Sequence, residues 1–291
     1  MKTNAKINTQ PYFLQFCQNI SLTLGRSKRL TTSKRNVEKK IKEHFTYHKL
    51  PRPDFFIQGS YKMKTMVIKS DGTYDVDLGV YFRRDNDLTP STVQKHVYEA
   101  VNGITSIGAK RKNKCVRLIY KSYYNIDLPV YSTYDTEHPH LATKKGWEES
   151  DPKELCAWFD YKAKKHGSQL ISLVKYFKAW ANVTSGRMPS GIAFSVWVAE
   201  NFIGHVRDDI AFYKTAVAIQ NTFGRHPTCI NPATPNDDFL EKLTPIQVVV
   251  FEDKFDKMIS LAKTALEEKT EAKALATWKK IFGRNFYVNL F

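Results

Sequence analysis

The segment FFIQGSYKMKTMVIKSDGTYDVDLGVYF, residues Phe55–Phe82, decides how we interpret the rest of the chain. It starts with a short apolar run, breaks at Gly59-Ser60, and resumes as an alternating stretch that contains Asp75 and Asp77. Successive side chains of a strand point to opposite faces, so aspartates two positions apart project from the same face. The sequence therefore predicts two carboxylates in one small volume.

These carboxylates predict a metal site beside a phosphate site. Like charges raise each other's pKa unless a cation lies between them. Mg2+ takes oxygen ligands, and two such ions about 3.5 to 4 Å apart can flank an in-line displacement at phosphorus. Gly59 lets a backbone approach a phosphate, and Ser60 is expected to cap a short helix over residues 61–66, whose N-H groups would face the anion. A solvated strand face and a plain turn are the alternatives.

A third carboxylate lies on a later strand. Residues 115–120 and 123–130 have the pattern of two strands, and Asp127 stands in the second among apolar neighbours. An unpaired charge in such an environment is costly, so Asp127 needs a partner. The partner is either a metal ion or a nearby Lys or Arg.

The order of these motifs resembles that of a known superfamily. G-S-Y, then D-V-D, then a lone Asp on a later strand is similar to the polymerase-β-like nucleotidyltransferases. The sequence segments QGSYKMKT, YDVDLGVYF and IDLPVY, followed by GWEESDPKELCAWF, look most like those of the bacterial cGAS/DncV-like nucleotidyltransferases, or CD-NTases. The resemblance implies an α+β fold with a mixed β-sheet catalytic lobe over residues 1–150, which includes N-terminal bracing helices. A helical lobe over residues 151–291 would supply nucleotide and triphosphate contacts, with the active site in the cleft between the lobes.

The resemblance also implies roles for single residues. Asp75, Asp77 and Asp127 would be the catalytic residues and the ligands of two Mg2+ ions, for which Mn2+ is a substitute. Gly59 and Ser60 would bind the triphosphate.

Two more nucleotide contacts are expected in the helical half. Residues 168–183, SQLISLVKYFKAWANV, have apolar residues at helical spacing. The L-x-x-L-V-K-Y-F pattern is similar to the helix that gives a lysine to the β and γ phosphates in related enzymes, which places Lys175 there and Lys178 one turn away on the flank. Ser190 begins the next helix, where the family offers a triphosphate-binding serine. A surface lysine and an N-cap serine are the plain alternatives.

The charge of the chain predicts a polyanionic ligand. The formal net charge is +16, from 45 Lys and Arg against 29 Asp and Glu. Nucleoside triphosphates and nucleic acid both fit this charge. A helix expected over residues 32–48 has a basic face without interleaved aromatic residues, which favours a solvated face over a nucleic-acid surface. The antibiotic-modifying nucleotidyltransferases are a poor match, because their acceptor substrate is cationic and so basic a protein would not attract it.

Composition bounds the remaining options. The hydrophobic share of 42% indicates a folded protein. Neither a membrane-length apolar run nor a signal peptide is evident, which predicts a soluble, cytoplasmic protein. The four cysteines form no C-x-x-C and are expected to be reduced thiols. His138, His140 and Cys156 do not have the spacing of a zinc site and are expected in loops.

Further elements follow from periodicity and turn signals. Residues 11–24 are expected to form a helix on the back of the catalytic sheet, and a basic turn at residues 25–29 is expected before the next helix. Helices are also expected over residues 90–101, 244–268 and 270–282. Asp85 and Asp87 are expected in a solvent-exposed turn. The core of the C-terminal part is predicted to contain Phe239, Leu243, Ile246, Val249 and Val250.

By resemblance, the protein joins nucleoside triphosphates with release of pyrophosphate. The expected substrates are ATP and/or GTP, with UTP or CTP as further options, and the product is a cyclic di- or trinucleotide. Such a messenger serves bacterial antiphage (CBASS) signalling and acts on a separate effector protein, and the enzyme is expected to be a monomer. An RNA 3′-end or 2′-5′ oligoadenylate-type nucleotidyltransferase and a non-catalytic nucleic-acid-binding relative are the alternatives. The presence of all three aspartates counts against the last one.

Overall fold

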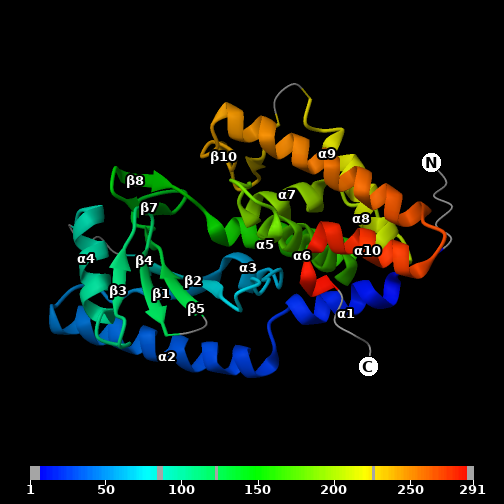
Figure 1. The fold of residues 1–291 in the computed structure, drawn as a ribbon. Helices are drawn as coiled ribbons and strands as arrows, with labels where there is room; N and C mark the ends of the chain where they lie inside the picture. Colours follow the sequence, from blue (N-terminus) through cyan, green and yellow to red (C-terminus); the bar gives the residue numbers. More distant parts are fainter. Residues whose placement is uncertain (1–6, 84–87, 122–123, 225–226, 287–291) are drawn as a thin grey trace. The chain divides into compact units, whose positions relative to one another are not determined.

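The computed structural model describes residues 7–83, 88–121, 124–224 and 227–286 (Figure 1). The chain forms two compact units, which we treat separately. The sheet unit comprises residues 22–64 and 71–157, and the helical unit comprises residues 1–21, 65–70 and 158–291. The predicted division near residue 150 therefore differs at the N-terminus, because residues 1–21 group with the helical unit. The predicted turn with Asp85 and Asp87 lies outside the described residues.

The sheet unit is organised around β2 (Tyr74–Phe82), which has partners on both sides. β1 (Asp54–Gln58) pairs with it antiparallel, while β5 (Tyr124–Leu128) and β6 (Val130–Ser132) pair parallel with its two halves. The sheet runs in the order β3-β4-β5-β2-β6-β7-β8, with β1 joined to β2. The other strands are β3 (Ala109–Arg111), β4 (Val116–Tyr120), β7 (His140–Thr143) and β8 (Gly146–Glu149).

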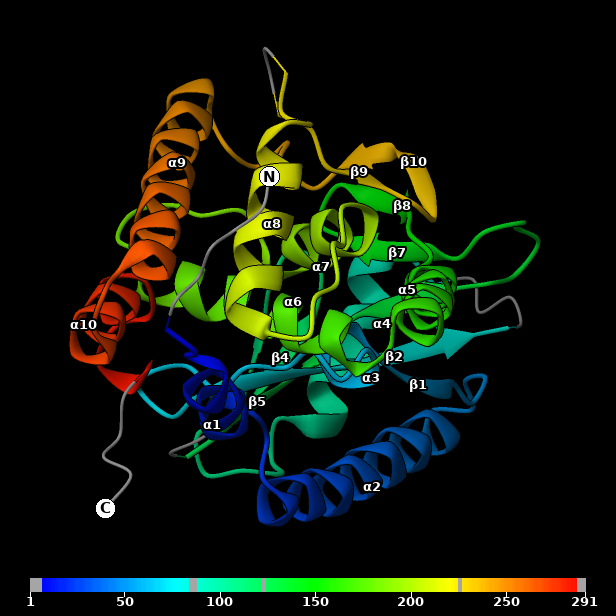
Figure 2. The same ribbon diagram turned by 90° about the vertical axis from the view of Figure 1, so that its right-hand side faces the viewer.

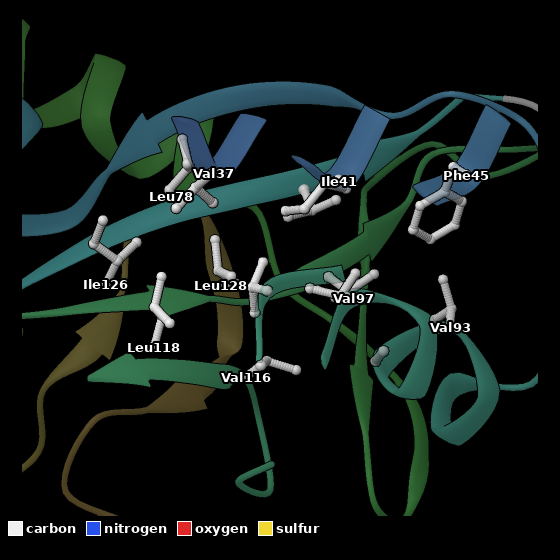
Figure 3. Close-up of a cluster of buried hydrophobic side chains, with 14 of the residues drawn as sticks. Val37, Ile41, Phe45, Leu78, Val93, Val97, Val116, Leu118, Ile126 and Leu128 are labelled. Carbon is white, nitrogen blue, oxygen red and sulfur yellow. The ribbon is translucent and has the colours of Figure 1, made fainter. Parts of the chain in front are cut away.

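Helices α2 (Leu24–Tyr47) and α4 (Pro90–Val101) cover one face of this sheet. Their apolar residues recur at helical spacing and pack against even-numbered residues of β2, β4 and β5, as Figure 3 shows. The buried helix residues are Val37, Ile41, Phe45, Val93, Val97 and Val101. Because side chains alternate along a strand, odd-numbered residues of β2 and β5 project from the opposite face.

Helix α2 is longer than the sequence predicted. It begins at Leu24, where the Thr23 side chain accepts a hydrogen bond from the Arg26 N-H at 3.4 Å. The predicted turn at residues 25–29 is therefore wrong. Gly25 lies in the first helical turn, whose N-H groups have no partner within the helix, and the basic residues that follow are good helix formers. The predicted start of α4 is confirmed, with Thr89 as its N-cap.

The helical unit contains the helices of the C-terminal half, which Figure 2 labels. The predicted helix over residues 168–183 is confirmed as α6 (Ser168–Val183), and the last two predicted helices are α9 (Pro245–Glu267) and α10 (Glu271–Phe282). The remaining elements are α1 (Gln10–Ile20), α7 (Gly191–Glu200), α8 (Asp208–Gln220), β9 (Ile230–Asn231), β10 (Thr234–Asp238) and η1 (Arg284–Phe286). Helix α5 (Pro152–His166) begins in the sheet unit, and α3 (Gly59–Lys62) belongs to it.

Two packing predictions for the helical unit are wrong. Helix α1 does not lie on the back of the sheet, because its Phe13 packs edge-on against Tyr176 of α6 with ring centroids 5.1 Å apart. Ile246, Val249 and Val250 are 77%, 56% and 39% exposed, so they are not core residues. The apolar run at the start of α9 is longer than its buried face, which begins at Phe251.

Within the described residues, no helix has both the length and the apolar composition that a membrane span requires.

The burial difference predicts unequal effects of two matched substitutions. Ile41→Ala removes a fully buried side chain from the sheet unit's core and should cost about 2 to 5 kcal/mol of unfolding free energy. Ile246→Ala, on an exposed face of α9, should change it by less than about 0.5 kcal/mol. Urea denaturation followed by circular dichroism measures both values. Equal losses would contradict the assignment of the core.

Candidate active site

The three predicted aspartates lie on adjacent strands and on one face of the sheet. β2 and β5 are parallel neighbours, with Asp77 opposite Asp127 and Asp75 opposite Asn125. All four are odd-numbered positions, so their side chains project from the face that α2 and α4 leave uncovered. The register thus brings together residues that are 50 positions apart in the sequence, as the hydrogen bond from Asn125 to Asp75 demonstrates.

Gly59 lies directly against Asp77. Its φ of +63° is in the left-handed region, and a Cβ built on it would lie only 2.4 Å from Asp77 Oδ2. Glycine is therefore required for two separate reasons, its backbone conformation and the space that the carboxylate occupies. The predicted contact between the glycine turn and the aspartates is present in the structure.

The predicted helix after this turn is wrong in its bounds. Helix α3 (Gly59–Lys62) has only four residues, its N-cap position is Gln58, and no side chain caps it. Ser60 is a member of the helix and not its cap. The left-handed Gly59 already turns the chain after β1, so the helix starts two residues earlier than the sequence pattern indicated. The role of Ser60 as a phosphate ligand stays a prediction.

Arg117 is the protein partner of Asp127. It lies opposite Asp127 in the antiparallel β4–β5 pair and donates two hydrogen bonds to it, from Nε to Oδ1 at 2.7 Å and from Nη2 to Oδ2 at 2.6 Å. Arg117 Nη2 also lies 3.7 Å from Asp75 Oδ1. The hydrogen bonds to Asp127 raise the pKa of the guanidinium, and the charges of Asp127 and Asp75 add to this effect. The sequence predicted either a metal ion or a nearby Lys or Arg as the partner of Asp127, and the structure has an arginine in this place.

Two further side chains, Asn125 and Cys115, lie near these carboxylates. Asn125 donates from Nδ2 to Asp75 Oδ1 at 2.8 Å, which fixes one oxygen of that carboxylate. Burial, followed by the nearby Asp127 charge, raises the pKa of the Cys115 thiol to about 12. Cys115 is therefore a neutral thiol at physiological pH and not a nucleophile.

The polar face continues along β2 beyond the aspartates. Gln58 Nε2 donates to the Tyr131 hydroxyl at 2.9 Å, and Tyr81 donates its hydroxyl to Gln58 Oε1 at 3.1 Å. Gly79 leaves the room for this arrangement, because a Cβ there would lie 2.5 Å from Gln58 Oε1. The network holds the end of β1 against β2 immediately before Gly59.

The donor set suits a hard divalent cation. Carboxylate oxygens are what Mg2+ and Mn2+ prefer, and the three aspartates are the acidic residues of this face on β2 and β5. Among the described residues, however, the trios of potential ligand atoms within 4.8 Å of one another do not include these three aspartates. Asp127 faces Arg117, so ligation by all three would require Asp127 to exchange one cation for another.

The predicted nucleotide contacts of the helical unit have different environments. Lys175 Nζ donates to Ser21 Oγ at 2.8 Å. Lys178 is buried and donates to Thr65 Oγ1 at 2.8 Å, so it is not a surface lysine. Ser190 is confirmed as the N-cap of α7, where its side chain accepts from the Ala193 N-H. The triphosphate roles of these three residues stay predictions.

The sequence did not reveal Arg117, Asn125 or Gln58 as members of the site. Arg117 had an available signal, because pairing β4 antiparallel with β5, the next strand along the chain, places it opposite Asp127. Gln58 and Asn125 had no comparable signal. Their roles depend on the pairing of β2 with strands that lie far away in sequence.

The fold and this face are similar to those of the DncV-like nucleotidyltransferases. Residues 53–131 match the family model described as "Cyclic GMP-AMP synthase DncV-like, nucleotidyltransferase domain". The match spans Gly59, Ser60 and all three aspartates. The predicted resemblance to the bacterial cGAS/DncV-like nucleotidyltransferases is therefore confirmed.

Two proteins and one solved structure are similar to a larger part of this chain. The chain is 36% identical over 181 residues to a cyclic GMP-AMP synthase of Escherichia albertii, a match that covers 57% of this chain and 41% of that protein. It is 22% identical to a cyclic AMP-AMP-AMP synthase of an Acinetobacter species, over 96% of this chain and 86% of the relative. The crystal structure of the Vibrio cholerae DncV cyclic AMP-GMP synthase has a TM-score of 0.84 at 16% identity, with 97% of each chain covered. This likeness confirms the predicted α+β fold.

Removal of Arg117 should expose its competition with a metal ion. Arg117→Met leaves Asp127, whose side chain is 13% exposed, without its cation, and should cost about 1 to 3 kcal/mol of unfolding free energy. Added Mn2+ should then raise the melting temperature more in this variant than in the wild type, because the ion replaces the lost positive charge of Arg117 beside Asp127. Arg35→Met, at an exposed position of α2, is the control. A smaller Mn2+ effect in Arg117→Met would show that Arg117 supports the metal site.

Proposed function

We propose that this protein is a Mg2+-dependent nucleotidyltransferase that joins nucleoside triphosphates into a cyclic di- or trinucleotide and releases pyrophosphate. One observation carries the proposal. Asp75, Asp77 and Asp127 project from one face of adjacent strands, beside a glycine that has no space for a Cβ. All of these residues lie in the segment that matches the DncV-like nucleotidyltransferase domain.

The three aspartates would hold the metal ions in this proposal. Mg2+, or Mn2+ in its place, supplies charge neutralisation of the triphosphate and a lower pKa of the attacking ribose hydroxyl. Asp75 is already oriented by Asn125, and Asp77 is fixed against Gly59. Asp127 is the group we expect to accept the proton of the hydroxyl. Arg117 holds the Asp127 carboxylate in place through two hydrogen bonds.

Each unit, taken by itself, contains candidate ligands for the triphosphate. Gly59 and Ser60 offer backbone and hydroxyl contacts at the turn after β1. Lys175 and Ser190 are our candidates in the helical unit, and Lys178 is retained as a weaker one because its ammonium group already contacts Thr65. With these contacts, catalysis consists mainly of positioning and charge stabilisation.

The names of the relatives support the substrate class. They are synthases of cyclic GMP-AMP and cyclic AMP-AMP-AMP, so ATP with or without GTP is the substrate set we propose, and UTP or CTP are further candidates. A cytoplasmic role in antiphage signalling through a separate effector, carried out by a monomer, completes the proposal. The basic surface also permits nucleic acid, which we treat as an outcome of the product test.

Loss of the central pair of carboxylates should abolish the reaction. The variant Asp75→Asn with Asp77→Asn removes both charges with little change in volume, and we expect pyrophosphate release below detection. Circular dichroism should remain that of the wild type. Turnover by this double variant would show that the metal assignment is wrong.

Product analysis separates cyclisation from its alternatives. Incubation with the four radiolabelled triphosphates and Mg2+, followed by phosphatase, should leave a resistant labelled product because a ring has no terminal phosphate. Nuclease P1 then distinguishes 3′-5′ from 2′-5′ linkages. Label on the ends of added RNA, or a phosphatase-sensitive linear product, would overturn the proposed cyclic product and favour an RNA-extending or oligoadenylate-type enzyme.

Two glycine substitutions test the contact beside Asp77. Gly59→Ala places a Cβ against the carboxylate, whereas Gly72→Ala adds one at a similar φ of +79° with no atom within 4 Å. Both should lose about 1 kcal/mol or more of stability from backbone strain. Only Gly59→Ala should also lower the turnover rate, by about 100-fold, since a displacement of about 1 Å has this effect at an active site. Equal rates in the two variants would contradict the role of Gly59.

A further inference from the structure

Three histidines meet where the end of α2 packs against α4. His44 lies in the last turn of α2, His48 is the residue that follows the helix, and His96 lies in the middle of α4. Each offers one ring nitrogen, and these three atoms lie within 4.8 Å of one another. The cluster belongs entirely to the sheet unit and has no part in the aspartate site.

The distances suit a tetrahedral metal ion. His44 Nε2 and His96 Nδ1 are 3.1 Å apart. Two nitrogens bound to one tetrahedral zinc at about 2.0 to 2.1 Å lie about 3.3 Å apart, so little movement is required. Glu99 is the candidate for a fourth donor, because its Oε2 lies 4.0 Å from His44 Nε2 and 3.9 Å from His96 Nδ1 and would move closer on binding.

The protonation state of the cluster favours ligation. Burial lowers the pKa of His44, and the nearby His48 and His96 lower it further. Burial and His48 likewise lower the pKa of His96, against the opposing charge of Glu99. Neutral imidazole is the form that binds a metal ion, so the direction of both shifts agrees with the geometry of the cluster.

We propose that His44, His48, His96 and Glu99 form a zinc site that joins the end of α2 to α4. Imidazole nitrogens with one carboxylate are a donor set for zinc, whereas Mg2+ selects oxygen ligands. The site is therefore chemically separate from the three aspartates. It does not depend on the proposed nucleotidyl transfer.

A second cluster is a weaker candidate. His138, Asp151 and Glu154 also place three potential ligand atoms within 4.8 Å of one another. Asp151 Oδ1, however, already accepts hydrogen bonds from the N-H groups of Lys153 and Glu154 at the start of α5. The cluster thus has one histidine and a carboxylate that is engaged in capping a helix. Cys156, which was expected in a loop, is buried in α5 and is not a member of this cluster.

The position of the proposed site gives it a structural role. α2 and α4 are the two helices that cover the face of the sheet opposite to the aspartates. His44 and His96 each precede a core residue, Phe45 and Val97, that is fully buried. A zinc ion would thus link the two helices at the edge of the core and should stabilise the sheet unit by binding only its folded form.

Zinc titration of the whole chain, without a histidine tag, tests the proposal. Calorimetry in the presence of excess Mg2+, which occupies oxygen sites, should give one zinc ion per chain and a raised melting temperature. His48→Gln alters an exposed side chain beyond the helix, so this variant should fold, and His96→Gln is the second test. Each should weaken zinc binding by at least about 10- to 100-fold, the effect known for even indirect ligand partners.

The control is His138→Gln, which should leave zinc affinity unchanged. Co2+ in place of zinc should give the intense visible absorption of a tetrahedral site in the wild type, and His48→Gln should lose it. The proposal is overturned if the wild type binds no zinc, if both cluster variants bind it as tightly as the wild type does, or if His138→Gln removes the binding.

Discussion

Repulsion between carboxylates on one face of a sheet is the constraint on which the site depends. Asp75, Asp77 and Asp127 occupy neighbouring positions of β2 and β5, where their negative charges lie close together. Arg117 supplies a compensating positive charge. It donates two hydrogen bonds to Asp127 and lies close to Asp75. A divalent cation that binds all three carboxylates would therefore have to replace Arg117 at Asp127.

The strand alternation provides both halves of this arrangement. Even-numbered residues of β2 and β5 build the core with α2 and α4, and odd-numbered residues carry the polar face. A shift of register by one residue would exchange the two sets, so the hydrophobic core also fixes the position of the aspartates. Gly59 and Gly79 complete the face by leaving space for Asp77 and Gln58. Stability and chemistry therefore rest on the same pairing.

Local sequence patterns were sufficient to predict several features of the fold and of the site. The alternation in β2 predicted that Asp75 and Asp77 share a face, and the Thr-Pro pair predicted the start of α4. Long-range pairing was not accessible, and therefore Arg117 and Asn125 were missed. Amphipathic patterns also failed to tell which apolar residues are buried: Ile246 and Val249 follow the pattern but face solvent, and Lys178 is buried despite its charge. In each case tertiary contacts, which no single segment contains, decided the outcome.

A crystal structure with Mn2+ and a non-hydrolysable triphosphate would show whether the three aspartates bind metal ions. We expect anomalous density about 2.0 to 2.2 Å from carboxylate oxygens of Asp75, Asp77 and Asp127, with Arg117 displaced from at least one oxygen of Asp127. Density elsewhere, with the Arg117–Asp127 pair unchanged, would contradict this expectation.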